Sequence, residues 1–315
     1  MATQFKSSDL AAMDRTVRAS FTEAFSAKSA YTPWSMRIAS MESSTSATNL
    51  YHFGIDSGNF REWAEGERHV NSIGAGSMTV TNVKRELTYG VKREAIDDDA
   101  TGALRGVVSR VRSAAGKLRR LPDRLMAAAL DANGTSLSGV ALFHDAHPIP
   151  GTSRTFDNNY ASTALTRDNA VAMRAAMLSI RGSDGDILNQ DPRILLVPPE
   201  LEDVAIEIAY GGLKVKAGTS TTNVSTVLEN SARGLFEPIV APQLSQYSQT
   251  TWYLVDASDA YDRALIHQVR EAAELVALFS PDDPEVFMRD EYLWGWRERS
   301  AVAAGNPARI ARGVA

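Results

Sequence analysis

Apolar and polar residues alternate most regularly between residues 101 and 133. Apolar side chains recur there at steps of three and four residues, a spacing that places them on one stripe of an α-helix. The stripe consists of Leu104, Val107, Val108, Val111, Ala114, Ala115, Leu118, Leu121, Leu125, Ala128 and Ala129. Basic residues cover much of the remaining surface. The pattern predicts one spine helix of roughly thirty residues, far longer than the average of about 11–12.

The ends and the middle of this spine carry their own signals. The acids at 97–99 precede it and favour the positive end of the helix dipole, whereas Asn133 and Gly134 are typical of a helix end. Pro122 lacks a backbone donor and clashes with the preceding turn, so we expect a kink or a break near residues 118–120.

Residues 1–42 carry a second, shorter helical pattern, which Trp34 follows. Its apolar positions are Leu10, Met13, Val17, Phe21 and Phe25. A segment of about forty residues with one apolar stripe cannot bury that stripe on itself. We therefore interpret it as an arm that packs on another part of the protein or on another subunit, with Phe21, Phe25 and Trp34 as candidate inter-subunit contacts.

Residues 43–86 combine turn-forming residues with large apolar side chains. One interpretation is a loop that folds back over the core of its own domain. The other is a long protruding hairpin whose side chains contact a neighbouring subunit, because an extended apolar hairpin is not stable alone. The candidate contacts are Phe60, Arg61, Glu62, Trp63, Glu67 and Arg68. Residues 78–89 then alternate as in a strand that leads into the spine.

The rest of the chain mixes helices and strands. A helix is expected from Thr166 to Gly182, a buried strand over 193–199, a helix through 201–208 and a strand over 251–257. Residues 211–231 are rich in Gly, Thr, Ser and Asn and predict an exposed loop or interface tip. The C-terminal quarter predicts strands over 264–271, 273–279 and 293–304, with a turn at SPDDPEV.

Composition narrows the class of protein. The chain has 315 residues, of which 44% are hydrophobic and 23% charged, as in a soluble globular protein. A net charge of -5 argues against a dedicated nucleic-acid binder, and the absence of cysteine excludes disulfides and thiol nucleophiles. The apolar runs are too short to span a bilayer and the N-terminus lacks a signal sequence. We therefore expect that the protein is made in the cytoplasm and has no membrane partner.

Candidate chemistry is sparse. His144, Asp145 and His147 form the one cluster that could ligate a metal, but zinc needs three or four ligands and the other histidines have no companion pattern. A turn whose side chains bond the backbone is the simpler interpretation. The acids at 97–99 are better explained by the helix dipole than by acid-base catalysis. No phosphate-binding glycine loop or nucleophile motif occurs, so we predict no catalytic, cofactor or metal site.

Six short motifs, in this order, resemble those of phage major capsid proteins of the Hong Kong 97 type. They are FREW at 60–63, GVKREAIDDD at 90–99, LFHDAHP at 142–148, WYLVD at 252–256, ELVA at 274–277 and EYLWG at 291–295. The chain is most similar to the major head subunit family of Mu-like phages. No single motif is specific, but their common order strengthens the resemblance.

The resemblance implies an α+β fold in four parts. These are an N-terminal arm (1–42), an extended hairpin loop or E-loop (43–86), a peripheral domain with spine helix 101–133 (87–148 and 262–315), and a central mixed α/β axial domain (149–261). It also implies a structural head subunit, not an enzyme, that self-assembles into hexamers and pentamers of an icosahedral or prolate shell around double-stranded DNA. A virion assembled in the bacterial cytoplasm is the expected location.

Two departures from relatives refine these expectations. No lysine lies between Lys28 and Lys84, which argues against a covalent weld through the hairpin. The chain reaches the arm almost at Met1, so a separate scaffold protein is the simpler hypothesis. A portal protein and a decoration protein are further expected partners. The alternatives are a nanocompartment shell protein of the same fold, similar to encapsulins, and a metal-dependent enzyme that uses His144, Asp145 and His147.

Overall fold

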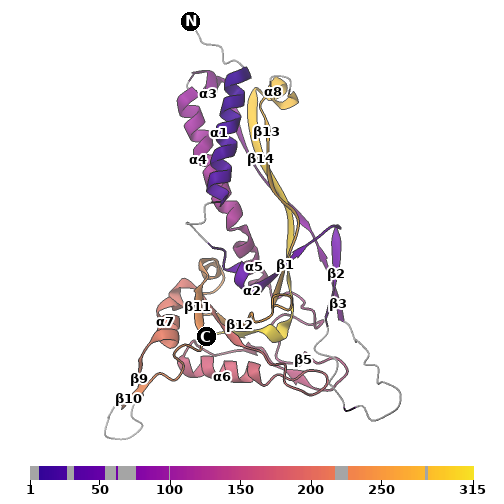
Figure 1. Ribbon diagram of the computed structural model, residues 1–315, viewed down its shortest axis with the longest axis vertical. Helices are drawn as coiled ribbons and strands as arrows, with labels where there is room; N and C mark the ends of the chain where they lie inside the picture. The colour runs from indigo at the N-terminus through magenta and orange to yellow at the C-terminus, as the bar shows by residue number, and fades with distance from the viewer. Residues whose placement is uncertain are drawn as a thin grey trace.

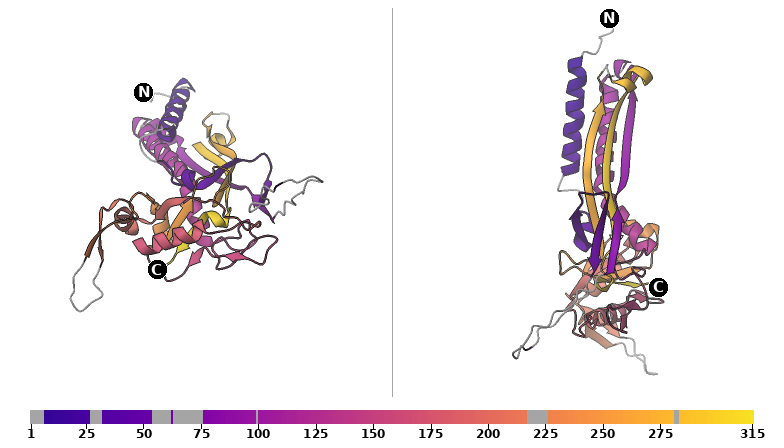
Figure 2. Two further views of the ribbon diagram at one scale, coloured as in Figure 1. Left: turned by 60° about the horizontal axis from the view of Figure 1, so that its bottom comes forward. Right: turned by 90° about the vertical axis from the view of Figure 1, so that its right-hand side faces the viewer.

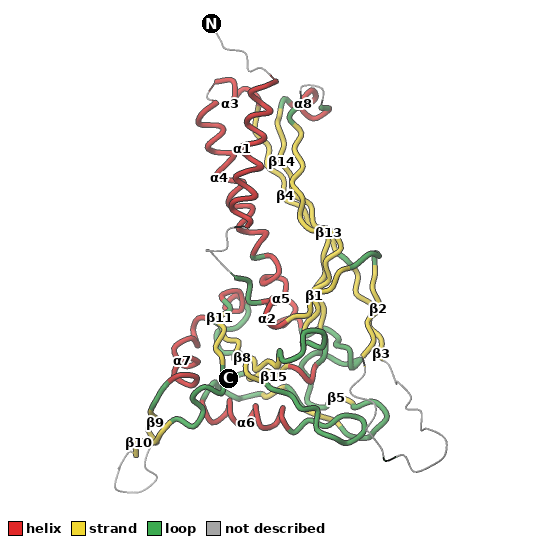
Figure 3. Tube along the Cα trace, in the orientation of Figure 1, coloured by secondary structure: helices red, strands yellow, loops and turns green. Residues whose placement is uncertain are grey.

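The chain forms a tall unit of helices and long strands that rises from a broader unit with its own sheet (Figure 1). This computed structural model describes residues 7–26, 32–53, 62, 76–98, 100–216, 226–280 and 283–315. Helices form one side of the tall unit and strands the other (Figure 3). The C-terminus lies in the lower unit, far from the N-terminus (Figure 1).

A four-stranded sheet is the backbone of the tall unit. Its order is β1 (Ala39–Ser43), β13 (Leu265–Leu278), β14 (Glu291–Ala304) and β4 (Val83–Lys92). β1 runs parallel to β13, and the other pairs are antiparallel. Alternate side chains of β14, among them Trp294 and Trp296, are buried toward the helices. The two predicted strands over 264–279 are in fact one strand. In the predicted turn, the Asp283 N–H donates to Ser280 O at 2.9 Å, and α8 (Pro284–Arg289) begins directly after it.

The predicted spine is present but consists of consecutive helices. α3 (Arg93–Asp98) and α4 (Ala100–Arg119) are followed by α5 (Leu121–Ala132), with Arg120 as a turn residue between α4 and α5. Pro122 occupies the first turn of α5, where its missing N–H costs nothing. The expected break is therefore confirmed, and so is the end at Asn133, whose φ is 48°. Two of the predicted capping acids, Asp97 and Asp98, instead belong to α3.

The N-terminal helix α1 (Ser7–Ser26) packs along α4 in the same chain (Figure 2). Its buried Met13 and Val17 join Val107 and Val111 of α4 in one apolar cluster with the tryptophans of β14. The arm thus buries its stripe on its own spine, one of the two partners that we predicted. The short helix α2 (Ser35–Ile38) follows it.

The lower unit is organised around a five-stranded sheet. Its order is β11 (Glu237–Val240), β8 (Pro192–Val197), β12 (Trp252–Asp256), β15 (Ile310–Gly313) and β7 (Asn159–Tyr160). Helices α6 (Arg167–Leu178) and α7 (Glu202–Tyr210) cover one face, and α5 with α2 covers the other. Three 3-10 helices connect these elements: η1 (Pro199–Leu201), η2 (Pro242–Gln246) and η3 (Pro307–Arg309).

Hairpins extend from both units. β2 (Thr48–Phe53) pairs with β3 (Gly76–Thr81), β5 (His147–Pro148) with β6 (Thr155–Phe156), and β9 (Leu213–Lys216) with β10 (Thr226–Glu229). Residues 213–216 and 226–229, which we predicted as part of an exposed loop or interface tip, are therefore strands.

The single strand that we predicted over 78–89 is divided between two sheets. β3 ends at Thr81 and β4 begins at Val83, so the chain changes sheets at Asn82. The buried Asn82 amide donates to Ser44 Oγ and to Ser46 O, each at 3.0 Å, and fixes the crossing. β15, which the predicted division placed with the peripheral domain, pairs with β12 and β7 in the lower sheet.

Candidate assembly surfaces

The two phenylalanines of α1 divide between the core and the surface. The Phe21 ring lies 5.6 Å from Trp296 of β14, and so belongs to the packing of its own chain. Phe25 stacks on Phe21 at 5.5 Å but remains 42% exposed. Of the predicted contacts on α1, Phe25 is therefore the more exposed, whereas Phe21 is partly buried.

Trp34 is buried in its own chain, whereas we predicted it as a contact with another subunit. It is 4% exposed and packs in the apolar cluster between α5 and the lower sheet. Its indole N–H donates to Gln243 Oε1 at 2.9 Å, so the polar edge of the ring is also satisfied within the chain. Trp34 anchors the end of the arm to the core and leaves almost no surface for a second subunit.

The hairpin stem projects beside the long sheet (Figure 1). Tyr51 of β2 donates a hydrogen bond to Gln268 Oε1 of β13 at 2.9 Å, which ties the stem to the sheet. Leu50, on the same strand, is 57% exposed. Of the predicted contacts beyond the stem, Glu62 is exposed. The others, Phe60, Arg61, Trp63, Glu67 and Arg68, lie outside the described residues.

The sequence reasoning missed an apolar pair at the tip of the long sheet. Phe287 and Met288 of α8 are 82% and 76% exposed. Asp283 is the N-cap residue of α8 and Pro284 the first helical residue, which is a recognisable helix start. We interpreted this segment as a turn because its acids and prolines are equally typical of turns.

The outer surface of α4 is basic. Residues 100–122 contain no Asp or Glu, whereas Arg105, Arg110, Arg112 and Lys117 are exposed there. One of these cations, Arg112, forms an ion pair with Glu23 of α1 at 2.9 Å. These exposed cations form what we call the cationic face of α4, in a chain whose net charge is negative.

The cluster of His144, Asp145 and His147 is a hydrogen-bonded turn. The fully buried His147 ring places Nε2 3.0 Å from Asn158 Oδ1 and Nδ1 3.0 Å from Ser138 Oγ. Asn158 Oδ1 accepts, so Nε2 carries the proton and Nδ1 accepts from the Ser138 hydroxyl. Both nitrogens of a neutral ring are thereby occupied.

The neighbours of His147 are also engaged locally. His144 Nδ1 accepts the backbone N–H of Ala146 at 2.9 Å, and Asp145 Oδ1 accepts from the Asn159 amide at 2.9 Å. Burial lowers the pKa of His147 to about 4, which favours the neutral ring. Within the described ranges, no group of three or more His, Cys, Asp or Glu residues could hold a metal ion. The arrangement therefore favours the turn over the metal-dependent enzyme.

None of the described helices has the length and apolar character needed to cross a membrane.

Comparison with known proteins gives a family match along nearly the whole chain. The model of one family, described as Mu-like prophage major head subunit gpT, matches residues 10–164, 156–244 and 239–308. A search of curated proteins found no match.

Two solved structures with a similar fold come from a procapsid and a capsid. In the procapsid of bacteriophage JBD30, the similar chain is 21% identical with a TM-score of 0.55, and the match covers 99% of this chain and 76% of that one. In the capsid of a native GTA particle, the values are 10% identity, a TM-score of 0.52, and coverage of 90% and 91%. These likenesses show the fold, and the family match gives the role. The chain belongs to the Mu-like prophage major head subunit family and is a structural major capsid protein with the fold of the Hong Kong 97 type.

Proposed function

We propose that copies of this chain assemble into hexamers and pentamers of an icosahedral or prolate shell that encloses double-stranded DNA. The role is structural, with noncovalent contacts between subunits instead of catalysis. The similar solved chains come from a procapsid and from a capsid, which supports self-assembly as the activity of this chain.

The observation that carries the proposal is the separation of exposed apolar side chains along an elongated subunit. Phe25 lies on the arm helix, Leu50 on the hairpin stem and Phe287 at the tip of the long sheet, and each is more than 40% exposed. Apolar groups rimmed by polar residues are typical of interaction sites. A shell subunit must contact several neighbours at once, and exposed apolar side chains on several distant elements, these three among them, suit that requirement better than one interface does.

The hairpin supplies a second group of proposed contacts. Its stem is tied to the long sheet by Tyr51 and Gln268, so its direction is fixed where it leaves the body. Phe60, Arg61, Glu62, Trp63, Glu67 and Arg68 would then contact a neighbouring subunit. Arm and hairpin together would hold adjacent subunits, with Phe25 as the contact on the arm.

The cationic face of α4 supports the proposed content of the shell. Exposed cations such as Arg105 and Arg110 would meet phosphates without sequence preference, as diffuse positive surfaces do. We further propose a separate scaffold protein, a portal and a decoration protein as partners. Assembly would take place in the bacterial cytoplasm, and the product would be the virion capsid.

Sedimentation velocity of the purified chain, alone and co-expressed with a scaffold protein, tests the proposal. We expect a fast-sedimenting, homogeneous particle that contains many copies. If the proposal were wrong, the chain would stay a small species both alone and with the scaffold protein. Nuclease-resistant DNA in particles from infected cells would distinguish a DNA-filled head from a compartment for a protein cargo.

A further inference from the structure

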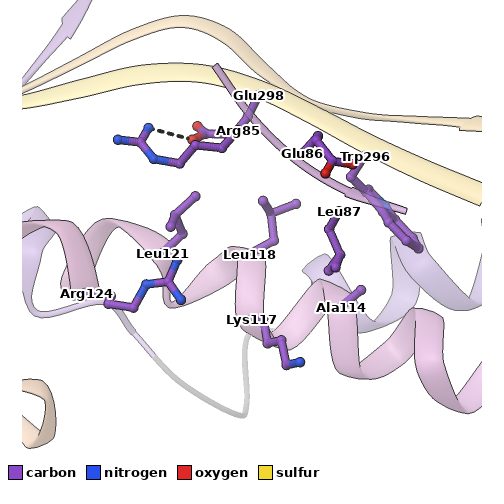
Figure 4. Close-up of a pocket in the computed structure, with 10 residues that line it drawn as sticks. All are labelled: Arg85, Glu86, Leu87, Ala114, Lys117, Leu118, Leu121, Arg124, Trp296 and Glu298. Atoms are coloured by element: carbon purple, nitrogen blue, oxygen red, sulfur yellow. Dashed lines mark hydrogen bonds and ion pairs between the residues drawn. The ribbon is translucent and has the colours of Figure 1, made fainter. Parts of the chain in front are cut away.

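A cleft of about 260 Å³ lies between the spine and the long sheet, where α4 ends and α5 begins (Figure 4). Its floor is apolar. Leu118 and Leu121 point from the helices toward the strands, and Leu87 points back toward the helices (Figure 4). Ala114 and Trp296 complete the floor. The break in the spine coincides with the cleft, because the two leucines lie on either side of it.

The helical rim of the cleft is cationic. Lys117 and Arg124 line it, both are exposed, and neither has an ion-pair partner within the part of the chain that the structure describes. On the strand side, the exposed Glu86 accepts a hydrogen bond from Thr88 Oγ1 at 2.9 Å, while Arg85 and Glu298 pair with each other. Arg85 donates to Glu298 Oε1 at 2.9 Å and to Ser300 O at 3.1 Å, so that pair is internally satisfied.

A buried donor at the cleft is also unsatisfied. Trp296 is almost wholly buried, and its indole N–H has no acceptor among the described residues. Buried indole N–H groups normally have a partner. The cleft therefore combines an apolar floor, one of whose residues has an unsatisfied buried donor, with positive charge on its helical rim.

We propose that this cleft docks a short acidic segment of a partner protein. The segment would place one leucine-sized side chain on the floor and its carboxylates beside Lys117 and Arg124. The volume is below the roughly 300–1,000 Å³ of small-molecule sites and suits a side-chain anchor. Duplex DNA would meet the same cations, but it has no apolar group to fill the floor. The inference goes beyond shell formation, since binding concerns the unassembled subunit.

Fluorescence anisotropy with the full-length, unassembled chain tests the docking. The probe is a fluorescein-labelled octapeptide in which every third residue is leucine and the others are glutamate. We expect saturable binding in roughly the micromolar range. Replacing the leucines of the probe by alanine, or its glutamates by glutamine, should weaken binding by about tenfold or more.

Variants of the protein locate the site. Lys117→Glu with Arg124→Glu removes the cationic rim, and Leu118→Gln makes the floor polar at a half-buried position. Both should weaken binding by about tenfold or more. Arg105→Glu is the matched control, because Arg105 is exposed on the same helix and does not line the cleft. Its affinity should stay within about twofold of the wild type, and melting curves would show that all variants fold.

Three outcomes would overturn the inference. The first is no saturable binding of the probe up to about 1 mM. The second is an equal loss in the Arg105→Glu control, or tighter binding of duplex DNA that Leu118→Gln leaves unchanged, since either result indicates a diffuse cationic surface. The third is a loss of self-association in sedimentation by Lys117→Glu with Arg124→Glu, while the peptide does not bind the wild type. That result would mean that the cleft binds a second copy of the chain.

Discussion

Acid should destabilise the folded subunit through His147. The ring is fully buried, and burial lowers its pKa to about 4 from the ordinary 6.5. Between these values the unfolded chain binds a proton that the folded chain does not. The contribution of His147 to stability is therefore complete above about pH 6.5 and is lost as the pH falls toward 4.

The size of the effect follows from the shift. A difference of about 2.5 pKa units corresponds to about 3 kcal/mol of unfolding free energy. That is a large share of the roughly 5–15 kcal/mol by which a typical domain is stable. The buried acid Asp256 adds a loss of stability of the same sign at lower pH. Burial raises its pKa, but hydrogen bonds from Ser258 and Arg309 together lower that pKa below its ordinary value.

Urea unfolding of the unassembled subunit, followed by circular dichroism between about pH 7 and pH 4.5, measures the effect. His147→Gln should lower stability at neutral pH, because the bonds to Ser138 and Asn158 change. Over this pH range it should also lose about 2 kcal/mol less than the wild type. His144→Gln is the control, since that ring is exposed. Equal pH dependence of the wild type and His147→Gln would refute the reasoning, and so would a large stabilisation by added zinc that requires His147.

Further predictions concern the tip, the packing of glycines and the hairpin. The double variant Phe287→Ser with Met288→Ser should change the unfolding free energy by less than about 0.5 kcal/mol yet reduce the yield of shells in sedimentation. An unchanged yield would mean that the tip of the long sheet makes no contact between subunits. Gly305→Ala should cost about 1–3 kcal/mol in urea unfolding, because its Cβ would lie 2.4 Å from a backbone carbonyl oxygen. Gly116→Ala, with open space around it in α4, should instead stabilise by roughly 0.5–1 kcal/mol, and the opposite order would contradict the packing argument. Trp63→Ala should leave the subunit folded and impair assembly, whereas an unfolded monomer would mean that the hairpin belongs to its own core.

Local patterns predicted the helices well. The stripe from Leu104 to Ala129 and the proline at 122 are local signals, so the spine, its break and its end at Asn133 could be read from the sequence. The arm helix was predictable for the same reason. Its partner was not, because an apolar stripe requires a cover without saying which surface provides it.

Strand pairing depended on residues distant in the sequence. Nothing local distinguishes a strand that stays in one sheet from one that changes sheets at Asn82, since the crossing is fixed by bonds to residues 44 and 46. The return of β15 to the lower sheet likewise follows from its register against β12. Short strands such as β9 and β10 lie in turn-rich sequence and need each other to form.

Candidate contacts could be predicted only as residue types. Trp34 and Phe25 are both aromatic and both lie near the end of the arm, yet one is buried and the other is 42% exposed. The difference arises from Gln243 and the lower sheet, which lie some two hundred residues away in the sequence. Sequence periodicity cannot tell a core aromatic from an interface aromatic, because both must be covered.

Electron cryomicroscopy of particles assembled from this chain tests the central claim most directly. We predict a closed shell built of pentamers and hexamers, in which the arm and the hairpin of each subunit contact its neighbours. A map in which the chain forms no closed shell, or in which Phe25 and the hairpin face solvent in every copy, would contradict it.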